Sequence, residues 1–245
     1  MANDQKPVIS VRKLRKVYMM GQEHVVALHN IDLDIPRGEV CCIFGTSGSG
    51  KSTLLNQLAG LEKPTRGVVR IGGVPISRLN ENQLAAFRQK HIGFVFQSYN
   101  LLPELTAAEN VAMPLMFKGV DPDVRLLEAK KMLCRVGLKD RMDHFPNQMS
   151  GGQQQRVGIA RAFITQPEVV FADEPTGNLD TRTTKEVMHM IRGFAHRFHQ
   201  TIVLVSHDPE MTEYADRIVT LIDGRIVSNV ENQVKAEIDA APYIE

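Results

Sequence analysis

The fold of this chain is decided by the octapeptide Gly45-Thr46-Ser47-Gly48-Ser49-Gly50-Lys51-Ser52. It fits the P-loop pattern in full, directly after an apolar strand at residues 40–44 and before an apolar helix from Leu54. Glycines let backbone N–H groups turn inward around phosphate oxygens, and the helix N-terminus adds partial positive charge. Lys51 can reach the outer phosphates, the Ser52 hydroxyl can ligate Mg²⁺, and Thr53 completes the binding segment. The stretch therefore predicts a nucleoside triphosphate site at the end of a strand.

The overall composition limits the class of protein. A chain of 245 residues with 43% hydrophobic residues can bury a sizeable core as one α/β unit with an insertion. The formal net charge is +1, so nothing at the level of the whole chain predicts a nucleic-acid partner. The apolar stretches are far too short to cross a bilayer, and the polar N-terminus lacks the apolar region of a signal peptide. We expect a soluble protein that stays inside the cell.

The cysteines indicate neither a disulfide framework nor a metal site. Cys41 and Cys42 are adjacent within the apolar strand before the P-loop, and Cys134 stands alone. We expect all three to be buried as small apolar side chains, with a reactive thiol as the alternative.

Alternating apolar runs and helical stretches predict an α/β fold with a mostly parallel sheet. Near the N-terminus, three strands have no helix between them long enough for a parallel crossover: residues 8–17, 31–35 and 68–71. They predict an antiparallel β flank. Strands return later in the chain at residues 169–172, 201–205 and 217–221, and Asp223-Gly224 then predicts a hairpin turn.

The middle of the chain has a helical pattern. Thr106 with Glu109 forms a capping box, Asp121-Pro122 begins a second helix, and Gly137 ends it. We expect a single domain over residues 1–245, made of three parts. These are a nucleotide-binding core with its β flank at 1–96 and 165–228, a helical subdomain at 97–164, and a C-terminal tail at 229–245 that forms a loose end or a short helix.

Two carboxylates stand at the end of a buried strand, in the run Val169-Val170-Phe171-Ala172-Asp173-Glu174. The carboxyl ends of strands are where ligands of open α/β sheets bind. Asp173 is placed to hold Mg²⁺, directly or through water. Glu174 is placed to orient and deprotonate an attacking water, because the γ-phosphate needs an in-line nucleophile.

A third motif, Ser150-Gly151-Gly152-Gln153, begins a helix that runs to about residue 164. Ser150 and Gln153 have the spacing of a capping box, and the two glycines leave backbone donors unobstructed. Such a helix N-terminus attracts phosphate, although the four residues alone also fit an ordinary helix start.

Taken in their order along the chain, these motifs resemble the nucleotide-binding subunit of an ATP-binding cassette (ABC) transporter over nearly the whole length. The match includes Gln97 after a strand at 92–96, the Asn178-Leu179-Asp180 run after the two acids, and His207 after a strand at 202–205. Met149 departs from the family pattern, in which the signature motif usually begins with Leu, but its apolar volume is similar.

The resemblance implies a role for each of these residues. Gln97 would contact Mg²⁺ and water and signal to the membrane partner, Asp180 would lie at a dimer interface, and His207 would contact the γ-phosphate. Tyr18 stands where such proteins stack an aromatic ring on adenine. From the residues alone, Tyr18 also fits a packed strand aromatic, Gln97 a polar strand end, and Asp180 the N-cap of the following helix.

Within the family, residues 92–97, 100–103, 106–114 and 171–180 are similar to the branch of lipoprotein-releasing, macrolide-efflux and cell-division ATPases. The resemblance implies a head-to-tail homodimer that hydrolyses ATP with Mg²⁺ at the cytoplasmic face of the inner membrane, held there by an integral membrane permease on a separate chain. Its work would be export or mechanical work on lipoprotein, peptide or drug substrates. The alternative is an ATPase that regulates cell-division or cell-wall enzymes without transport.

Two further alternatives belong to other classes of protein. A nucleic-acid ABC ATPase would need a long coiled coil between the Gln97 and Ser150 regions or a second cassette, and the chain has neither. A simple kinase would not need the motifs at residues 150–153 and 178–180. The apolar stretch at residues 99–117 is either a docking site for the membrane subunit or the core of the helical subdomain.

Overall fold

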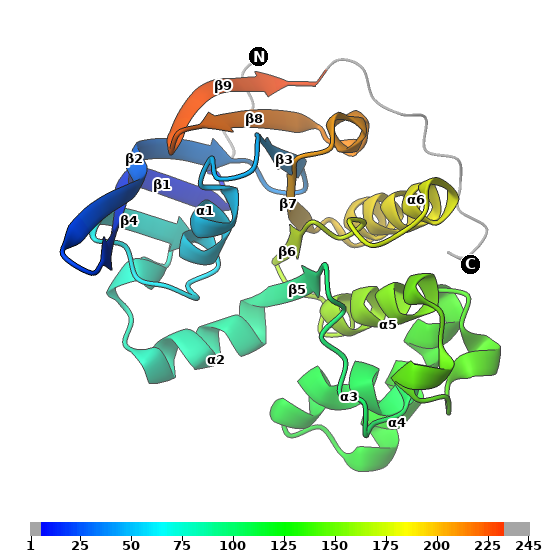
Figure 1. Ribbon diagram of the computed structural model, residues 1–245. Coiled ribbons are helices and arrows are strands. Elements are labelled where there is room, and N and C mark those ends of the chain that lie inside the picture. The colour runs from blue at the N-terminus through cyan, green and yellow to red at the C-terminus, as the bar shows by residue number, and fades with distance from the viewer. Residues whose placement is uncertain (1–5, 233–245) are drawn as a thin grey trace. The chain divides into compact units, whose positions relative to one another are not determined.

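The computed structural model describes residues 6–232 and divides them into two compact units. The first unit contains residues up to 88 together with those from 201 onward, and the second contains residues 89–200. Figure 1 labels the helices and strands of both units. Among the described residues, no helix has the length and apolar character needed to cross a membrane.

The first unit contains the predicted antiparallel flank. Its strands are β1 (Ile9–Met20), β2 (Glu23–Ile35) and β4 (Arg66–Ile71), in the order β2-β1-β4, and both pairings are antiparallel. The β1–β2 hairpin extends beyond the predicted ranges, because Met20 pairs with Glu23 around a turn at Gly21, whose φ is 63°. This extension was not predicted, since its polar and methionine side chains lack the apolar alternation of a half-buried strand.

The parallel part of this unit carries the P-loop. β3 (Val40–Phe44) pairs in parallel with β7 (Thr201–Ser206) on one side and β8 (Arg217–Ile222) on the other. The strand β3 is almost entirely buried, which explains its continuous apolar sequence. Helix α1 (Lys51–Leu58) follows it.

The predicted hairpin after β8 is confirmed. Asp223 and Gly224 both have positive φ, and they connect β8 to the antiparallel strand β9 (Arg225–Glu231). The end of β9 lies inside the segment expected to be a loose tail or short helix, so that expectation was wrong up to Glu231. Residues 233–245 of the same expectation lie outside the described residues.

The second unit combines two parallel strands with four helices. β5 (Ile92–Phe96) pairs with β6 (Val169–Asp173), and the helices are α3 (Ala107–Phe117), α4 (Pro122–Arg135), α5 (Gly151–Phe163) and α6 (Thr181–Phe198). Helix α2 (Glu81–His91) contains the division between the two units. The remaining short helices are 3-10 turns: η1 (Ile76–Arg78), η2 (Lys139–Arg141), η3 (Pro146–Gln148) and η4 (Pro209–Tyr214).

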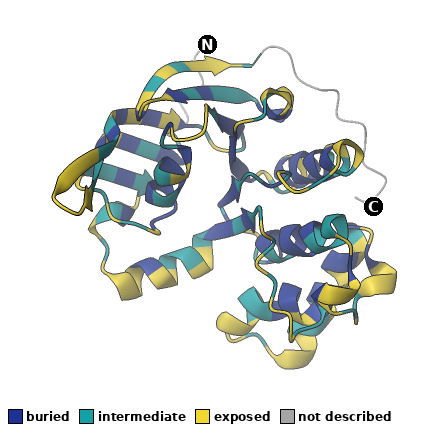
Figure 2. Cartoon of the chain, viewed as in Figure 1, coloured by how far each residue is buried: buried dark blue, intermediate teal, exposed yellow. Residues whose placement is uncertain are grey.

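The predicted helix boundaries in this unit are confirmed. The Thr106–Glu109 capping box begins α3, the Asp121 side chain caps α4, and Gly137 with φ 71° follows the end of α4. Each such cap contributes about 1 kcal/mol to helix stability. Buried residues, dark blue in Figure 2, are frequent along α5 and α6. The ring centroids of Phe163 on α5 and Phe194 on α6 lie 5.1 Å apart in this core.

The cysteine prediction is confirmed in part. Cys41 and Cys42 are buried, and burial raises the pKa of the Cys42 thiol to about 12. Cys134 is exposed, so the expectation that it is buried was wrong. It lies on the outer face of α4, whereas the neighbouring Leu133 lies on the buried face.

Candidate nucleotide-binding and catalytic site

The P-loop has a backbone that only glycine accommodates at its last bend. Gly50 has a φ of 99°, and a Cβ added there would come within 2.8 Å of the Ala27 carbonyl oxygen. At Gly45 an added Cβ would come within 2.3 Å of the Leu221 carbonyl oxygen. The loop is thus held against β2 and β8 by close backbone approaches, which fix its shape before any ligand binds.

Helix α1 begins directly at Lys51 without a side-chain cap. Its N-cap is Gly50, which offers no side-chain acceptor, so the first-turn N–H groups face the loop interior without one. An uncapped helix N-terminus next to a glycine loop attracts anions, because partial positive charge and free donors coincide there.

Two polar groups in this loop suit a phosphate. The Lys51 side chain is only 6% exposed, and its Nζ donates to the Thr46 carbonyl oxygen over 2.8 Å. In the part of the chain that the structure describes, no carboxylate pairs with Lys51. The Ser49 hydroxyl is buried and has no hydrogen-bond partner among the described residues. A buried cation and an unsatisfied hydroxyl beside a helix start without a side-chain cap are the donor set of a bound polyphosphate.

Tyr18 projects from β1 with a fixed ring. Its hydroxyl donates to Glu62 Oε2 over 2.7 Å, and Lys16 Nζ lies 4.9 Å from the ring centroid. Burial, followed by the hydrogen bond to Glu62, raises the pKa of the Tyr18 hydroxyl. The ring is therefore oriented by polar contacts at its edge and over one face, which is compatible with both interpretations of Tyr18 made from the sequence.

His207 and the P-loop follow neighbouring strands. β3 and β7 are parallel, and Phe44 pairs with Ser206, so Gly45 and His207 leave adjacent strands at the same level. His207 is exposed there. The Ser206 hydroxyl accepts from Asp208 N over 3.0 Å, which shapes the turn that follows. The first unit thus brings together the P-loop and His207.

The second unit brings Gln97 and the two acids together. Phe96 of β5 pairs with Asp173 of β6, so Gln97 and Glu174 are each the next residue at the carboxyl ends of adjacent parallel strands. Glu174 has a φ of 44°, a left-handed conformation uncommon for a residue with a side chain. Such local strain is found where the position of one side chain matters for function.

The segment after Glu174 folds back onto Gln97. The Asn178 side chain donates to the Gln97 carbonyl oxygen over 3.1 Å, and a Cβ added at Gly177 would come within 2.6 Å of Gln97 Nε2. A side chain at 177 would require the Gln97 amide group to move. The contact joins the loop after β5 to the loop after β6.

The start of α5 has the predicted capping box. Ser150 Oγ accepts from Gln153 N over 3.3 Å, and Gln153 Oε1 accepts from Ser150 N over 3.0 Å. Added Cβ atoms would come within 2.7 Å of the Tyr99 hydroxyl at Gly151 and within 2.6 Å of Thr183 Cγ2 at Gly152. The two glycines thus permit close contact with neighbouring loops and leave the helix start bare.

Asp180 is the N-cap of α6, as one of the two interpretations predicted. Its Oδ1 accepts from Thr183 N over 3.0 Å and its Oδ2 from Thr183 Oγ1 over 2.6 Å. These hydrogen bonds lower the pKa of the Asp180 carboxyl. Thr183 contacts Gly152 as well, so it links the α5 start to the α6 start.

Sequence reasoning missed two polar residues on α5. Gln155 is fully buried and donates from Nε2 to the Pro175 carbonyl oxygen over 2.5 Å, directly after the strained Glu174. Arg161 donates to the carbonyl oxygens of Tyr99 over 2.8 Å and of Asn100 over 2.6 Å. Burial lowers the pKa of the Arg161 guanidinium. The sequence contained one signal for Gln155. This residue stands one helical turn before Ile159 and therefore lies on the buried face of the helix.

The predicted magnesium ligands fit the ion by their chemistry. Ser52 offers a hydroxyl, Gln97 an amide oxygen and Asp173 a carboxylate, and Mg²⁺ prefers hard oxygen ligands completed by phosphates and water. No cluster of three or more His, Cys, Asp or Glu side chains able to hold a metal occurs among the described residues. The fit therefore depends on phosphate oxygens as additional ligands.

Three features define a P-loop nucleotide hydrolase: a glycine-held loop at an uncapped helix start, a strand ending in two carboxylates, and a second helix start that combines a Ser150 cap with two glycines. The profile of the ABC transporter family matches residues 28–177. The chain belongs to the ABC transporter family and is an ABC ATPase that binds and hydrolyses ATP. The predicted α/β fold with a mostly parallel sheet, an antiparallel β subdomain and a helical subdomain is confirmed.

Several relatives are similar over most of this chain. An uncharacterized ABC transporter ATP-binding protein of Methanocaldococcus jannaschii is 48% identical over 220 residues, which cover 90% of this chain and 98% of the relative. The macrolide export ATP-binding/permease protein MacB of Escherichia coli is 45% identical over 223 residues, but this chain spans only 34% of it. The predicted similarity to the branch that contains macrolide-efflux ATPases is confirmed.

Solved structures agree with the fold. A dimeric ATP-binding cassette in a post-hydrolysis state, bound to ADP and Pi, superposes with a TM-score of 0.85 at 40% identity. The superposition covers 91% of this chain and 98% of that one.

Proposed function

We propose that two copies of this chain bind ATP head to tail and that the ATPase cycle drives an integral membrane permease on a separate chain. The observation that carries the proposal is the uncapped, glycine-held start of α1 with a buried Lys51 that has no carboxylate partner among the described residues. A relative 40% identical has been solved as a dimer bound to ADP and Pi, which supports the assembly. The dimer supplies the second half of the site.

In this mechanism, the P-loop N–H groups at residues 45–53 and Lys51 hold the phosphates, while the Tyr18 ring stacks on adenine. The carboxylate of Glu174 orients the attacking water and accepts its proton. The left-handed backbone at Glu174 sets the direction of this side chain. Ser52, Gln97 and Asp173 would hold Mg²⁺, which when bound neutralises charge on the β- and γ-phosphate oxygens. His207 contacts the γ-phosphate from the strand next to the P-loop.

The partner copy contributes its α5 start. The Ser150 hydroxyl and the N–H groups of Gly151 and Gly152 contact the γ-phosphate held by the other P-loop, with Gln153 keeping the helix start in shape. Asp180 lies at the same interface. Because the γ-phosphate then joins the two copies, its removal weakens the interface and opens the dimer.

We infer the membrane subunit and the cargo by analogy with the family branch. We place the dimer at the cytoplasmic face of the inner membrane, peripheral through the permease, with export or mechanical work on lipoprotein, peptide or drug substrates. The name of the relative MacB describes an ATP-binding/permease protein, which supports a permease as the partner of this cassette. The alternative function is regulation of cell-division or cell-wall enzymes without transport. A complex that hydrolyses ATP but transports nothing would favour this alternative.

The docking surface that we propose lies at residues 99–117. Buried residues such as Val111 form subdomain core, whereas Leu102, Met116 and Phe117 are exposed, the last at 61%. The buried residues of this stretch fit the interpretation as subdomain core, and the exposed residues fit the interpretation as a docking site. Replacing Phe117 by Ser should abolish coupled transport in the complex while basal ATP turnover stays unchanged. Unchanged transport would remove this surface from the proposal.

The test of the dimer mechanism is the Glu174→Gln variant. It retains shape but loses the proton acceptor, so hydrolysis should fall at least about 100-fold while Mg-ATP yields stable dimers on size-exclusion chromatography. Glu128→Gln is a matched control, because the Glu128 side chain is 44% exposed on α4 and its ion pair among the described residues is with Lys131. A variant that stays monomeric with Mg-ATP, alone and with its membrane subunit, contradicts the dimer mechanism.

A further inference from the structure

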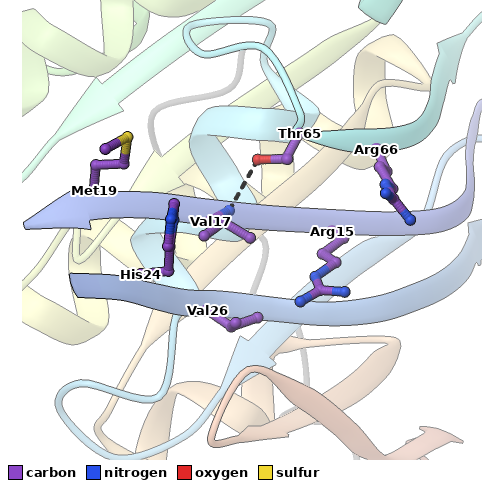
Figure 3. A pocket seen from close by; sticks show the side chains of 7 residues that line it. All are labelled: Arg15, Val17, Met19, His24, Val26, Thr65 and Arg66. Carbon is purple, nitrogen blue, oxygen red and sulfur yellow. Dashed lines mark hydrogen bonds between the residues drawn. The ribbon is translucent and has the colours of Figure 1, made fainter. Parts of the chain in front are cut away.

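A hollow of about 450 Å³ lies on the antiparallel sheet of the first unit, and no role assigned above uses it (Figure 3). Its lining comes from β1, β2, β4 and the residue before β4: Arg15, Val17, Met19, His24, Val26, Thr65 and Arg66. Figure 3 shows the two arginines at one end, Met19 and His24 at the other, and the valines between them.

The hollow is on the opposite face of β1 from Tyr18. Successive side chains of a strand point to opposite faces, so Arg15, Val17 and Met19 alternate with Lys16 and Tyr18. Lys16 and Tyr18 meet each other and Glu62 on their own face. A ligand in the hollow would therefore be separate from the adenine position proposed for Tyr18.

The two arginines are placed directly opposite one another without a counter-charge. Arg15 of β1 and Arg66 of β4 are register partners. Like charges directly opposite across strands destabilise a sheet. Neither guanidinium makes a hydrogen bond or an ion pair with any other described residue, and Arg15 Nε is buried without a partner. A buried guanidinium N–H without an acceptor costs free energy that an oxyanion would recover.

The adjoining hollow provides an internal comparison. It measures about 480 Å³ and shares Arg66, but its lining includes an acid, Asp32. Arg12 forms a two-pronged pair with Asp34, with contacts of 2.8 and 2.7 Å, and Asp32 accepts from Lys13 N. Arg12 is thus paired with an acid, whereas the lining of the hollow at Arg15 and Arg66 contains no acid.

The remainder of the hollow is apolar. Val17 and Val26 are register partners and form its middle, and Thr65 Oγ1 accepts from Val17 N over 3.0 Å. Met19 is 72% exposed at the far end. Methionine is flexible and polarisable and adapts to apolar ligands.

We propose that this hollow binds an anionic amphiphile, with a phosphate or carboxylate head between Arg15 and Arg66 and a short apolar chain over Val17, Val26 and Met19. Planar guanidinium groups bind such heads through paired hydrogen bonds. The head relieves the repulsion between the arginines, and the chain covers exposed valine and methionine. The amphiphile is a free organic phosphate or acid, or an anionic lipid at a membrane surface.

The location of binding is tested with methionine methyl groups as reporters. The protein is labelled with [methyl-¹³C]methionine and saturated with MgADP, and the Met19 signal is assigned from a Met19→Leu sample. Hexyl phosphate should shift the Met19 signal and bind at least about tenfold more tightly than inorganic phosphate, because its methylene groups leave water. Hexanol, which lacks the head, should leave the signal in place. An unmoved Met19 signal at saturating hexyl phosphate overturns the proposal.

Calorimetry with variants assigns the two ends of the hollow. Arg66→Gln should weaken hexyl phosphate at least about tenfold, since it removes one arm of the clamp. Arg66 is exposed, so the variant keeps its fold. Arg197→Gln, a matched change at an exposed position near the end of α6, should bind as the wild type does. Met19→Gln should weaken hexyl phosphate but leave inorganic phosphate unchanged. Equal affinities in the Arg66 and Arg197 variants contradict the proposal.

Vesicles distinguish the two sources of amphiphile. Cosedimentation with equal parts of phosphatidylcholine and phosphatidylglycerol, lost in Arg66→Gln and absent with pure phosphatidylcholine, assigns the site to membrane lipid. Hexyl phosphate binding without vesicle binding assigns it to a free amphiphile. Tighter binding of a short acidic peptide than of hexyl phosphate would show that the hollow recognises a protein partner, and the proposal would then be wrong.

Discussion

The two helix starts proposed to contact phosphate, at α1 and at α5, are built in different ways. At α1 the N-cap is Gly50, in a left-handed conformation without any side-chain cap, and a buried Lys51 follows. At α5 the N-cap is Ser150, which forms a complete capping box with Gln153. The first start has unsatisfied donors and an unpaired cation among the described residues, whereas the second is largely satisfied within its own chain.

The difference indicates an order of binding. Polar groups that are buried and unsatisfied gain most from a ligand, so the α1 start should bind phosphate by itself. The α5 start already satisfies Gln153 N and gains less, so it should act only when a second copy brings it to a γ-phosphate that is already held. Single substitutions at either helix start test this order of binding.

The largest effect is expected from Lys51→Gln. Removing a charged donor to phosphate should weaken ATP binding by about 10- to 100-fold, measured by calorimetry. Because Lys51 is buried without a carboxylate partner among the described residues, the melting temperature of the ligand-free variant should stay unchanged or rise. A lower melting temperature with normal ATP affinity would show that Lys51 stabilises the fold and does not bind phosphate. The proposed difference between the α1 and α5 helix starts would then be wrong.

A smaller effect on binding, with a clear effect on turnover, is expected from Ser150→Ala. The variant loses a helix cap of about 1 kcal/mol and the hydroxyl proposed to contact the partner's γ-phosphate. ATP affinity of the monomer should remain normal while hydrolysis falls about tenfold or more. Ser150→Thr keeps both the cap and the hydroxyl and should restore most of the activity. Weakened ATP binding by the monomer would show that the α5 start contributes to ATP binding within its own chain.

Gln155→Leu tests whether α5 helps to position Glu174. The change keeps the buried volume but removes the hydrogen bond to the Pro175 carbonyl oxygen, directly after Glu174. We expect kcat to fall by several-fold with little change in ATP affinity, because only the direction of Glu174 is loosened. Asn229→Leu, on the exposed strand β9, serves as the control. An unchanged kcat in Gln155→Leu would show that Glu174 is held by its own backbone alone.

The smallest effect is expected from Asp180→Asn, as a dependence of stability on pH. The Thr183 hydrogen bonds lower the folded-state pKa of Asp180 below its unfolded value. The charged cap therefore stabilises the fold above the ordinary aspartate pKa of about 3.9, and this contribution is lost as pH falls through the lowered folded value. The difference in melting temperature between wild type and variant should shrink as pH is lowered through that range. A constant difference would show that the charge of Asp180 does not contribute.

Local patterns made much of the site predictable. The P-loop, the capping boxes at Thr106 and Ser150 and the hairpin at Asp223-Gly224 each depend on residues within a few positions of one another, so the sequence contains the whole interaction. The tail prediction failed up to Glu231 because β9 is stabilised by pairing with β8, and its own exposed residues show little pattern. Strand pairing can override weak local preference in this way.

By itself, the amino-acid sequence determined that this protein is an ABC ATPase with a P-loop, a pair of carboxylates after a buried strand and a signature helix, because those motifs are short and their order is specific. Only the tertiary structure showed that Arg161 binds the Tyr99 and Asn100 carbonyl oxygens, that Gln155 reaches Pro175, and that Arg15 opposes Arg66. These contacts join residues 20 to 62 positions apart or residues of separate strands. Distance along the chain does not encode such pairings, since register and helix packing bring them together only when the core forms.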